Sequence, residues 1–121
     1  MKFQAPIPLF RIFDHALAKA FYVDWLGFAI DWEHRFTPTA PRYLQISRDG
    51  VILHLTEHHG DFSPGAKIMV HIDDVKALHR ELHARPNPYM NPGIEDAPWH
   101  ARIPQVIDPL GNRICFNQSL G

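Results

Sequence analysis

Two different spacings of hydrophobic residues alternate along the first half of the chain. Leu17, Phe21 and Trp25 recur every four residues and predict an amphipathic helix. Asp14 is placed to cap the start of this helix, and Gly27 to end it. Segments rich in aromatic and β-branched residues predict strands around it. These segments are PIPLFRIF, FAIDWEHRF, RYLQISR and VILHLTE, the last two joined by an Asp49-Gly50 hairpin turn.

The same order of elements recurs after a shift of about 60 residues. KIMVHID predicts a strand, Asp74 a second helix cap, and VKALHRELHAR a second amphipathic helix. A Pro-rich stretch with a weak extended segment around Tyr89 and Met90 leads to ARIPQVID, a turn at 109–112, and RICFNQ. Each half alone would leave an apolar sheet face uncovered, so the halves are expected to pair, within one chain or between two chains.

Composition indicates one globular domain over residues 1–121. The chain is 45% hydrophobic and 21% charged, with 12 Lys and Arg against 13 Asp and Glu. This balance gives no basic patch, so nucleic acid is not an expected partner. No apolar run approaches the roughly 20 residues that span a bilayer, and MKFQAPIPLF lacks the features of a signal peptide. A cytoplasmic location without membrane contact is therefore expected, and the single Cys115 fits a reducing compartment.

The densest group of candidate metal ligands lies in GVILHLTEHHGD, residues 50–61. Histidines beside carboxylates are the donors that Zn²⁺ or Fe²⁺ favours. In a strand, however, His54 and His58 would lie roughly 13 Å apart, too far to share one ion. We expect His58, His59 and Asp61 on the loop that crosses between the two halves, where a looped chelate is the alternative.

AFYVDWLGF and IDPLGNRICF carry the patterns FY-x₃-LGF and DP-x-GN. With the two β-α-β-β-β units, they resemble the vicinal oxygen chelate superfamily, which includes glyoxalase I, extradiol dioxygenases and bleomycin resistance proteins. The resemblance covers nearly the whole chain and is closest to the short glyoxalase-like, bleomycin-resistance-like proteins. It implies an α+β fold, in which two βαβββ units, about residues 1–60 and 66–121, form a cupped mixed sheet.

In this superfamily a metal, where present, is held by residues from the first and last strand of each unit. The residues at those positions are Ile7, His54, Lys67 and Cys115. Ile7 has no donor atom and Lys67 is cationic, whereas a catalytic zinc site has three protein ligands. A resident metal is therefore not expected.

Strand alternation places a mixed set of side chains on the inner face of the cup. The ligand-binding candidates are the cations Arg11, Lys67 and Arg113, the histidines His34, His54 and His71, the aromatic Trp32 and Trp99, and Cys115. A planar or hydrophobic ligand could stack on the aromatic members. His34 fits a cavity wall and an exposed aromatic edge equally well.

Two kinds of function remain open. The first is metal-independent binding of a small, antibiotic-type molecule by a homodimer that protects by sequestration, as the resemblance implies. The alternative is a lyase, isomerase or dioxygenase that recruits Zn²⁺, Ni²⁺ or Fe²⁺ through His54, Cys115 and either Glu57 or His71. A metal-free enzyme would use one of these histidines as a general base. A regulatory or immunity-type binding module is not separated from the first function by any sequence feature.

Overall fold

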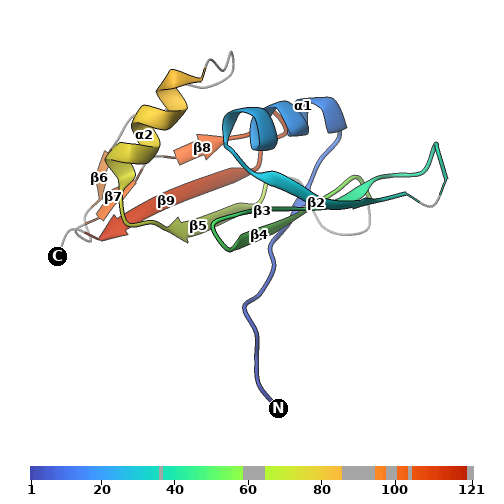
Figure 1. Cartoon of the computed structure of the whole chain (residues 1–121), viewed down its shortest axis with the longest axis horizontal. Helices are drawn as coiled ribbons and strands as arrows, with labels where there is room; N and C mark the ends of the chain where they lie inside the picture. Colours follow the sequence, from blue (N-terminus) through green and yellow to red (C-terminus); the bar gives the residue numbers. More distant parts are fainter. Residues whose placement is uncertain (36, 59–64, 86–94, 98–100, 104, 120–121) are drawn as a thin grey trace.

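The computed structural model describes residues 1–35, 37–58, 65–85, 95–97, 101–103 and 105–119, which form two sheets with the helices on one side (Figure 1). The first unit contains β1 (Leu9–Arg11), α1 (His15–Lys19), the π-helix η1 (Ala20–Trp25), β2 (Ala29–His34), β3 (Tyr43–Arg48) and β4 (Val51–Thr56). The second contains β5 (Lys67–His71), α2 (Val75–Ala84), β6 (Glu95–Ala97), β7 (Ala101–Ile103), β8 (Gln105–Ile107) and β9 (Arg113–Ser119).

The two sheets have the same strand order. The first runs β1-β4-β3-β2, and the second runs β5-β9-β7-β6 with β8 also paired to β9. β1 pairs with β4 in parallel, as β5 does with β9, and the other pairs are antiparallel. The predicted α+β fold with two βαβββ units is thus confirmed. The extended segment expected around Tyr89 and Met90 lies outside the described residues, and β6 is the strand that pairs with β7.

Local sequence signals account for the helix starts and the tight hairpin. The side chains of Asp14 and Asp74 accept hydrogen bonds from backbone N–H groups in the first turn of α1 and α2. The turn between β3 and β4 has positive φ angles of 50° at Asp49 and 81° at Gly50, as a two-residue hairpin requires. Within the described ranges, no helix is long and apolar enough to cross a membrane.

The first helix widens into a π-helix before it ends. In η1 the N–H of Leu26 donates to the carbonyl of Phe21, five residues earlier. Gly27 then ends the helix at a φ of 81°, where a side chain is strained. A Cβ at this position would also lie 3.0 Å from Nη1 of Arg48. The predicted end at Gly27 is confirmed, but the four-residue spacing of apolar residues did not reveal the π-helix.

One hydrophobic core joins the two units. Its members lie on the helix-facing sides of both sheets and on the helices themselves. They include Phe10, Ile12, Phe21, Tyr22, Trp25, Leu44, Ile46, Leu53 and Leu55 from the first unit, and Leu82, Val106, Ile114 and Phe116 from the second. Because these residues form a single cluster, the two units pack against each other within one chain.

A buried carboxylate lies where the two units meet. Asp108 accepts hydrogen bonds from the hydroxyl of Tyr22 at 2.6 Å and from Nδ2 of Asn112 at 3.0 Å. Its other oxygen accepts from the backbone N–H groups of Leu110 and Asn112. Nδ2 of Asn112 also donates to the carbonyl of Arg11 in β1. Tyr22 belongs to the FY-x₃-LGF pattern, whereas Asp108 and Asn112 belong to the DP-x-GN pattern, so the two patterns meet in one interior contact. Burial and the neighbouring Asp108 raise the pKa of Tyr22 well above its usual value.

Replacing Tyr22 with Phe should test this contact. The variant leaves one oxygen of a buried carboxylate short of a donor, so we expect the free energy of unfolding to fall by about 1–3 kcal/mol. Urea denaturation followed by circular dichroism measures the change. Tyr43→Phe is the matched control, because it removes a less buried hydroxyl and should cost less than about 1 kcal/mol. Equal stability of Tyr22→Phe and the wild type would contradict the assignment.

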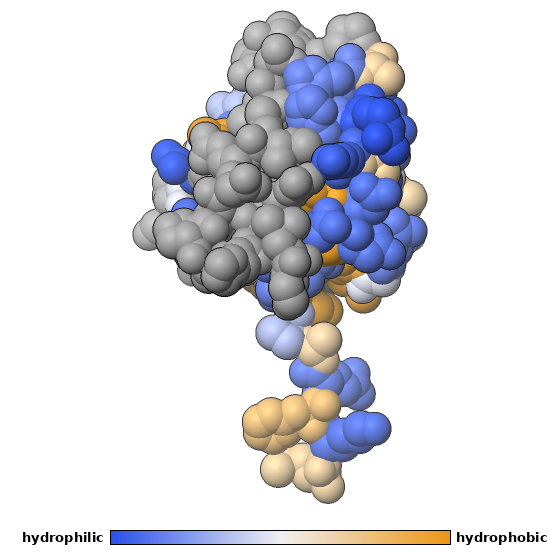
Figure 2. All heavy atoms as spheres, turned by 90° about the vertical axis from the view of Figure 1, so that its left-hand side faces the viewer, coloured by the Kyte–Doolittle hydropathy of each residue, from blue (hydrophilic) through white to orange (hydrophobic). Residues whose placement is uncertain are grey.

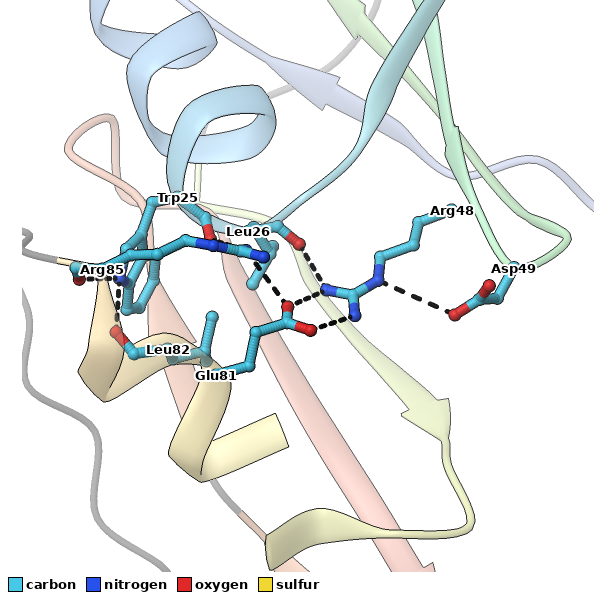
Figure 3. A network of polar contacts seen from close by, with 7 residues as sticks. All are labelled: Trp25, Leu26, Arg48, Asp49, Glu81, Leu82 and Arg85. Atoms are coloured by element: carbon cyan, nitrogen blue, oxygen red, sulfur yellow. Dashed lines mark hydrogen bonds and ion pairs between the residues drawn. The ribbon is translucent and has the colours of Figure 1, made fainter. Parts of the chain in front are cut away.

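An ion-pair network clamps the end of the first helix to α2 (Figure 3). Arg48 binds both carboxylate oxygens of Glu81, at 2.6 and 2.8 Å, and also donates to the carbonyl of Leu26 at 2.8 Å. Arg85 donates to Glu81 at 3.1 Å and to the carbonyl of Trp25 at 2.7 Å. Two carbonyls left without partners at the end of the helix are thereby satisfied.

The clamp should make the free energy of unfolding depend on pH in the acid range. Hydrogen bonds from Arg48 lower the pKa of Glu81 below its ordinary 4.5. Because the folded-state pKa is the lower one, the clamp stabilises the fold above pH 4.5, and this contribution disappears as the pH falls through the folded-state pKa. We therefore expect the stability difference between the wild type and Glu81→Gln to shrink as urea denaturation is moved from neutral to acid pH. A constant difference would contradict this, and Asp24→Asn is the control for an exposed carboxylate.

Candidate functional site

Each sheet has a second face, turned away from the shared core, which we call its open face. Residues paired across neighbouring strands lie on the same face of a sheet. On the open face of the first sheet the registers form two rows across the four strands, Leu9, His54, Gln45 and Trp32 in one, and Arg11, Thr56, Tyr43 and His34 in the other. Four of the predicted ligand-binding residues, Arg11, Trp32, His34 and His54, are therefore on this face.

The second sheet carries the other predicted residues in equivalent positions. Its open face pairs Lys67 with Arg113, Met69 with Cys115, and His71 with Asn117. Lys67, His71 and Arg113 are exposed, whereas Cys115 is buried. Trp99 lies outside the described residues. The predicted set is thus divided between the open faces of two sheets.

An aromatic cluster dominates the open face of the first sheet. The rings of Trp32 and Tyr43 are stacked, with centroids 5.9 Å apart and planes 8° from parallel. His54 meets both rings edge-on, at 5.3 Å from Trp32 and 5.2 Å from Tyr43, and His58 lies 6.4 Å from Tyr43. Trp32 is 44% exposed, so its indole offers a flat surface for stacking.

Sequence reasoning missed Tyr43 and Gln45 as members of this face. The strand register set by the hairpin turn could have identified both residues. A two-residue turn at Asp49-Gly50 pairs Arg48 with Val51, and counting outward from that pair brings Gln45 opposite His54.

A chain of hydrogen bonds holds His54 in place. Nδ1 of His54 lies 2.7 Å from the hydroxyl of Tyr43, and Nε2 lies 3.0 Å from Oε1 of Gln45. Gln45 in turn donates to Asp31 at 3.1 Å, and Ser47 donates to the same carboxylate at 2.9 Å. A β-bulge in β2 at this point lets Asp31 reach these polar side chains.

The carboxylate of Asp31, at the end of this series of hydrogen bonds, determines which nitrogen of His54 is protonated. Asp31 only accepts, so Gln45 must turn its amide nitrogen to Asp31 and its oxygen to His54. His54 therefore donates from Nε2 and accepts from Tyr43 at Nδ1. Burial lowers the pKa of His54, which favours the neutral ring. Both ring nitrogens are engaged by the protein.

This arrangement does not fit a metal site. Across the described ranges, no three His, Cys, Asp or Glu side chains are grouped closely enough to hold an ion. Besides the engaged His54, Glu57 accepts from the backbone N–H of Arg42, and Nδ1 of His71 lies 3.2 Å from Nδ2 of Asn117. Cys115 lies on the other sheet from His54 and Glu57.

Arg11 is the least solvated cation of the predicted set. It is 3% exposed, and its Nε has no hydrogen-bond partner in the described part of the chain. Its guanidinium lies 4.7 Å from the centre of the Phe13 ring, an arrangement that partly offsets the cost of burying a charge. Arg11 therefore holds a buried, unpaired Nε–H at the end of the row that contains Thr56, Tyr43 and His34.

Nitrogen NMR of histidine-labelled protein can test the state of His54. We expect the Nε2–H tautomer at neutral pH and a titration midpoint below the usual 6.5, because burial disfavours the cation. Tyr43→Phe keeps the ring that packs against His54, so burial persists and the midpoint should stay below 6.5. Proton occupancy on Nδ1 at neutral pH would contradict the hydrogen-bond chain.

Several solved structures share this fold. A bleomycin-binding protein complexed with bleomycin aligns with a TM-score of 0.73 and 18% identity, covering 97% of this chain and 99% of that chain. A bleomycin-binding protein from bleomycin-producing Streptomyces verticillus, complexed with copper(II)-bleomycin, aligns at 0.71 and 26% identity, covering 100% and 98%. TnmS3, an antibiotic binding protein from Streptomyces sp. CB03234, aligns at 0.70 and 26%, covering 98% and 99%.

Sequence comparison points the same way at the family level. No functionally curated protein matches the chain significantly in sequence. The sequence profile of glyoxalase superfamily proteins, in contrast, matches residues 1–121. Because this match spans the full length and the fold agrees with that of the bleomycin resistance proteins, the chain belongs to the glyoxalase superfamily.

Proposed function

We propose that this protein binds a small, planar, antibiotic-type molecule and protects by sequestering it, without a metal and without turnover. The observation that carries the proposal is the exposed indole of Trp32, stacked on Tyr43 and supported by a neutral His54. Such a surface suits a flat aromatic ligand, because stacking adds to the burial of apolar area. Proteins described as bleomycin-binding and antibiotic binding, each 26% identical to this chain, support the same ligand class.

The polar groups around the aromatic cluster favour binding over catalysis. A general base needs a nitrogen free to take a proton, and both nitrogens of His54 are already hydrogen-bonded. Cys115 is buried in a strand, which is typical of a packing residue and not of a nucleophile. The metal-dependent lyase, isomerase or dioxygenase considered from the sequence would need donors that lie apart here.

We further infer that the binding protein is a homodimer. The exposed apolar side chains of the described residues include Ile7 at 40%, Trp32 at 44%, Met69 at 48% and Ile107 at 37%. Residues 1–8 also extend away from the sheets (Figures 1 and 2). Exposed apolar residues of this kind are typical of a surface that another molecule covers. A second copy would enclose a ligand between open faces, with Lys67 and Arg113 contributing cations to the wall.

We also propose the domain organisation and the cytoplasmic location that the sequence predicts. The chain acts as one domain of two units, about residues 1–60 and 66–121. A cytoplasmic location fits the single, reduced Cys115.

Calorimetric titration with metal-free bleomycin-type glycopeptides and with other planar drugs tests the binding site. We expect saturable binding by the wild type and a loss of about tenfold in affinity for Trp32→Ala, because the stacking surface disappears. Trp32→Phe keeps a flat ring and should retain most of the affinity. If no planar compound binds, or if Trp32→Ala binds as well as the wild type, the proposed site is wrong.

A protein that only sequesters its ligand leaves the bound molecule chemically unaltered. The ligand should be recovered chemically unchanged after prolonged incubation, as judged by mass spectrometry, and a chelator should leave the dissociation constant unaltered. Sedimentation velocity should show a dimer. Product formation, or binding that depends on added Zn²⁺, Ni²⁺ or Fe²⁺, would favour the enzyme alternative.

A further inference from the structure

A cavity of about 610 Å³ lies between the two units. Four parts of the chain bound it, namely the segment after η1 with Leu26 and Phe28, the β3–β4 hairpin, strands β5 and β9, and the first turns of α2. We call it the inter-unit cavity. Its volume is in the range of small-molecule sites.

The inter-unit cavity lies on the helix-facing side of the sheets, apart from His71, which lines it from the end of β5 on the open face. Val51 and Arg48, which line it, are paired across the hairpin and share the face of the core residues Ile46 and Leu53. Phe116 lines it from the core side of the second sheet. A ligand here would thus contact the helix-facing side of both sheets, whereas Trp32 and His54 lie on the opposite side of the first sheet.

The floor of the cavity is apolar. Phe28 from the first unit and Phe116 from the second contribute aromatic rings, and Val51, Val70 and Ile72 contribute β-branched side chains. Such a lining favours a ligand body with apolar or aromatic surface.

The charge around the cavity is predominantly negative. The lining residues include one arginine, Arg48, and four residues with carboxylates, Asp49, Asp73, Asp74 and Glu81. The edge formed by the hairpin and α2 is visible in Figure 3. Arg48 is already bound to both oxygens of Glu81 and to a backbone carbonyl, so it is poorly placed to attract an anion. The remaining field favours a cation.

Two of the carboxylates are available to a ligand. Asp73 is exposed and has no hydrogen bond or ion pair within the described ranges. Asp49 forms an ion pair with Nε of Arg48 at 3.7 Å, but its side chain is 90% exposed and its carboxylate can also approach a second cation. Asp74, in contrast, is used to cap α2. His71, the other titratable lining residue, lies 3.2 Å from Asn117 through its Nδ1.

We propose that the inter-unit cavity is a second binding site, which takes a hydrophobic ammonium compound. The apolar or aromatic body lies against Phe28, Val70 and Phe116, and the protonated amine lies between Asp49 and Asp73. This site is independent of the stacking site on the open face, so either can be occupied without the other.

Fluorescence titration with dansylcadaverine tests the proposal. This probe joins an aromatic ring system to a primary ammonium through a short alkyl chain, and dansylamide provides a matched probe without the amine. In Trp32→Ala, which lacks the stacking surface of the open face, we expect saturable binding of dansylcadaverine, weakened by added salt, and much weaker binding of dansylamide. Equal binding of the two probes would overturn the assignment of a cation site.

Variants locate the site. Asp73→Asn should weaken binding about threefold, and Asp49→Asn with Asp73→Asn about tenfold, as expected for exposed charge pairs. Ala77→Phe should abolish binding by filling the cavity, with its thermal midpoint reported alongside. The variants are made in the Trp32→Ala background, which removes the stacking site on the open face. Asp24→Asn on the first helix is the matched charge control and should bind as Trp32→Ala does.

The outcomes separate this proposal from its alternatives. Amide chemical-shift changes confined to residues 26–28, 48–51, 70–81 and Phe116 support it, even if Ala77→Phe fails to fold. Changes centred on β2–β4 around Trp32, or full binding by the double Asn variant, overturn it. Absence of binding by the wild type, together with dissociation of a dimer by Ala77→Phe, would instead make the cavity a contact surface for a second copy.

Discussion

The buried carboxylate of Asp108 is the contact on which the rest of the molecule depends. A charge with almost no exposure is stable only when donors surround it, and the donors here come from Tyr22 on the first helix and from its own turn. Through Asn112 the same turn holds the backbone of β1 at Arg11. β1 thereby takes its place beside β4, and this pairing aligns the row that contains His54.

The aromatic cluster on the first sheet is a rigid surface. Tyr43 is held by stacking with Trp32 and by His54, while His54 is held by Tyr43 and Gln45. Each side chain that would face a ligand is thus positioned before the ligand arrives. A surface ordered in advance loses little conformational freedom on binding, which favours affinity for the planar ligand proposed above.

Much of the fold follows from short-range rules. The caps at Asp14 and Asp74, the turn at Asp49-Gly50 and the helix end at Gly27 each depend on neighbouring residues, and strand alternation placed Arg11 and His54 on one face. The π-helix, the bulge at Asp31 and the division of the site between two sheets depend on contacts between distant segments. The same holds for the tautomer of His54, which depends on partners from two other strands.

The clamp around Glu81 links the first helix mechanically to α2. Arg48 and Arg85 each join Glu81 to a carbonyl at the end of that helix, and Gly27 leaves just enough space for both guanidinium groups. If α2 tilted outward, the pair of Arg48 with Glu81, the bond of Arg85 to the Trp25 carbonyl and the bond of the Trp25 indole to the Leu82 carbonyl would break together. Any enlargement of the hollow beside α2 is therefore resisted, so occupants should be selected by size as strictly as by charge.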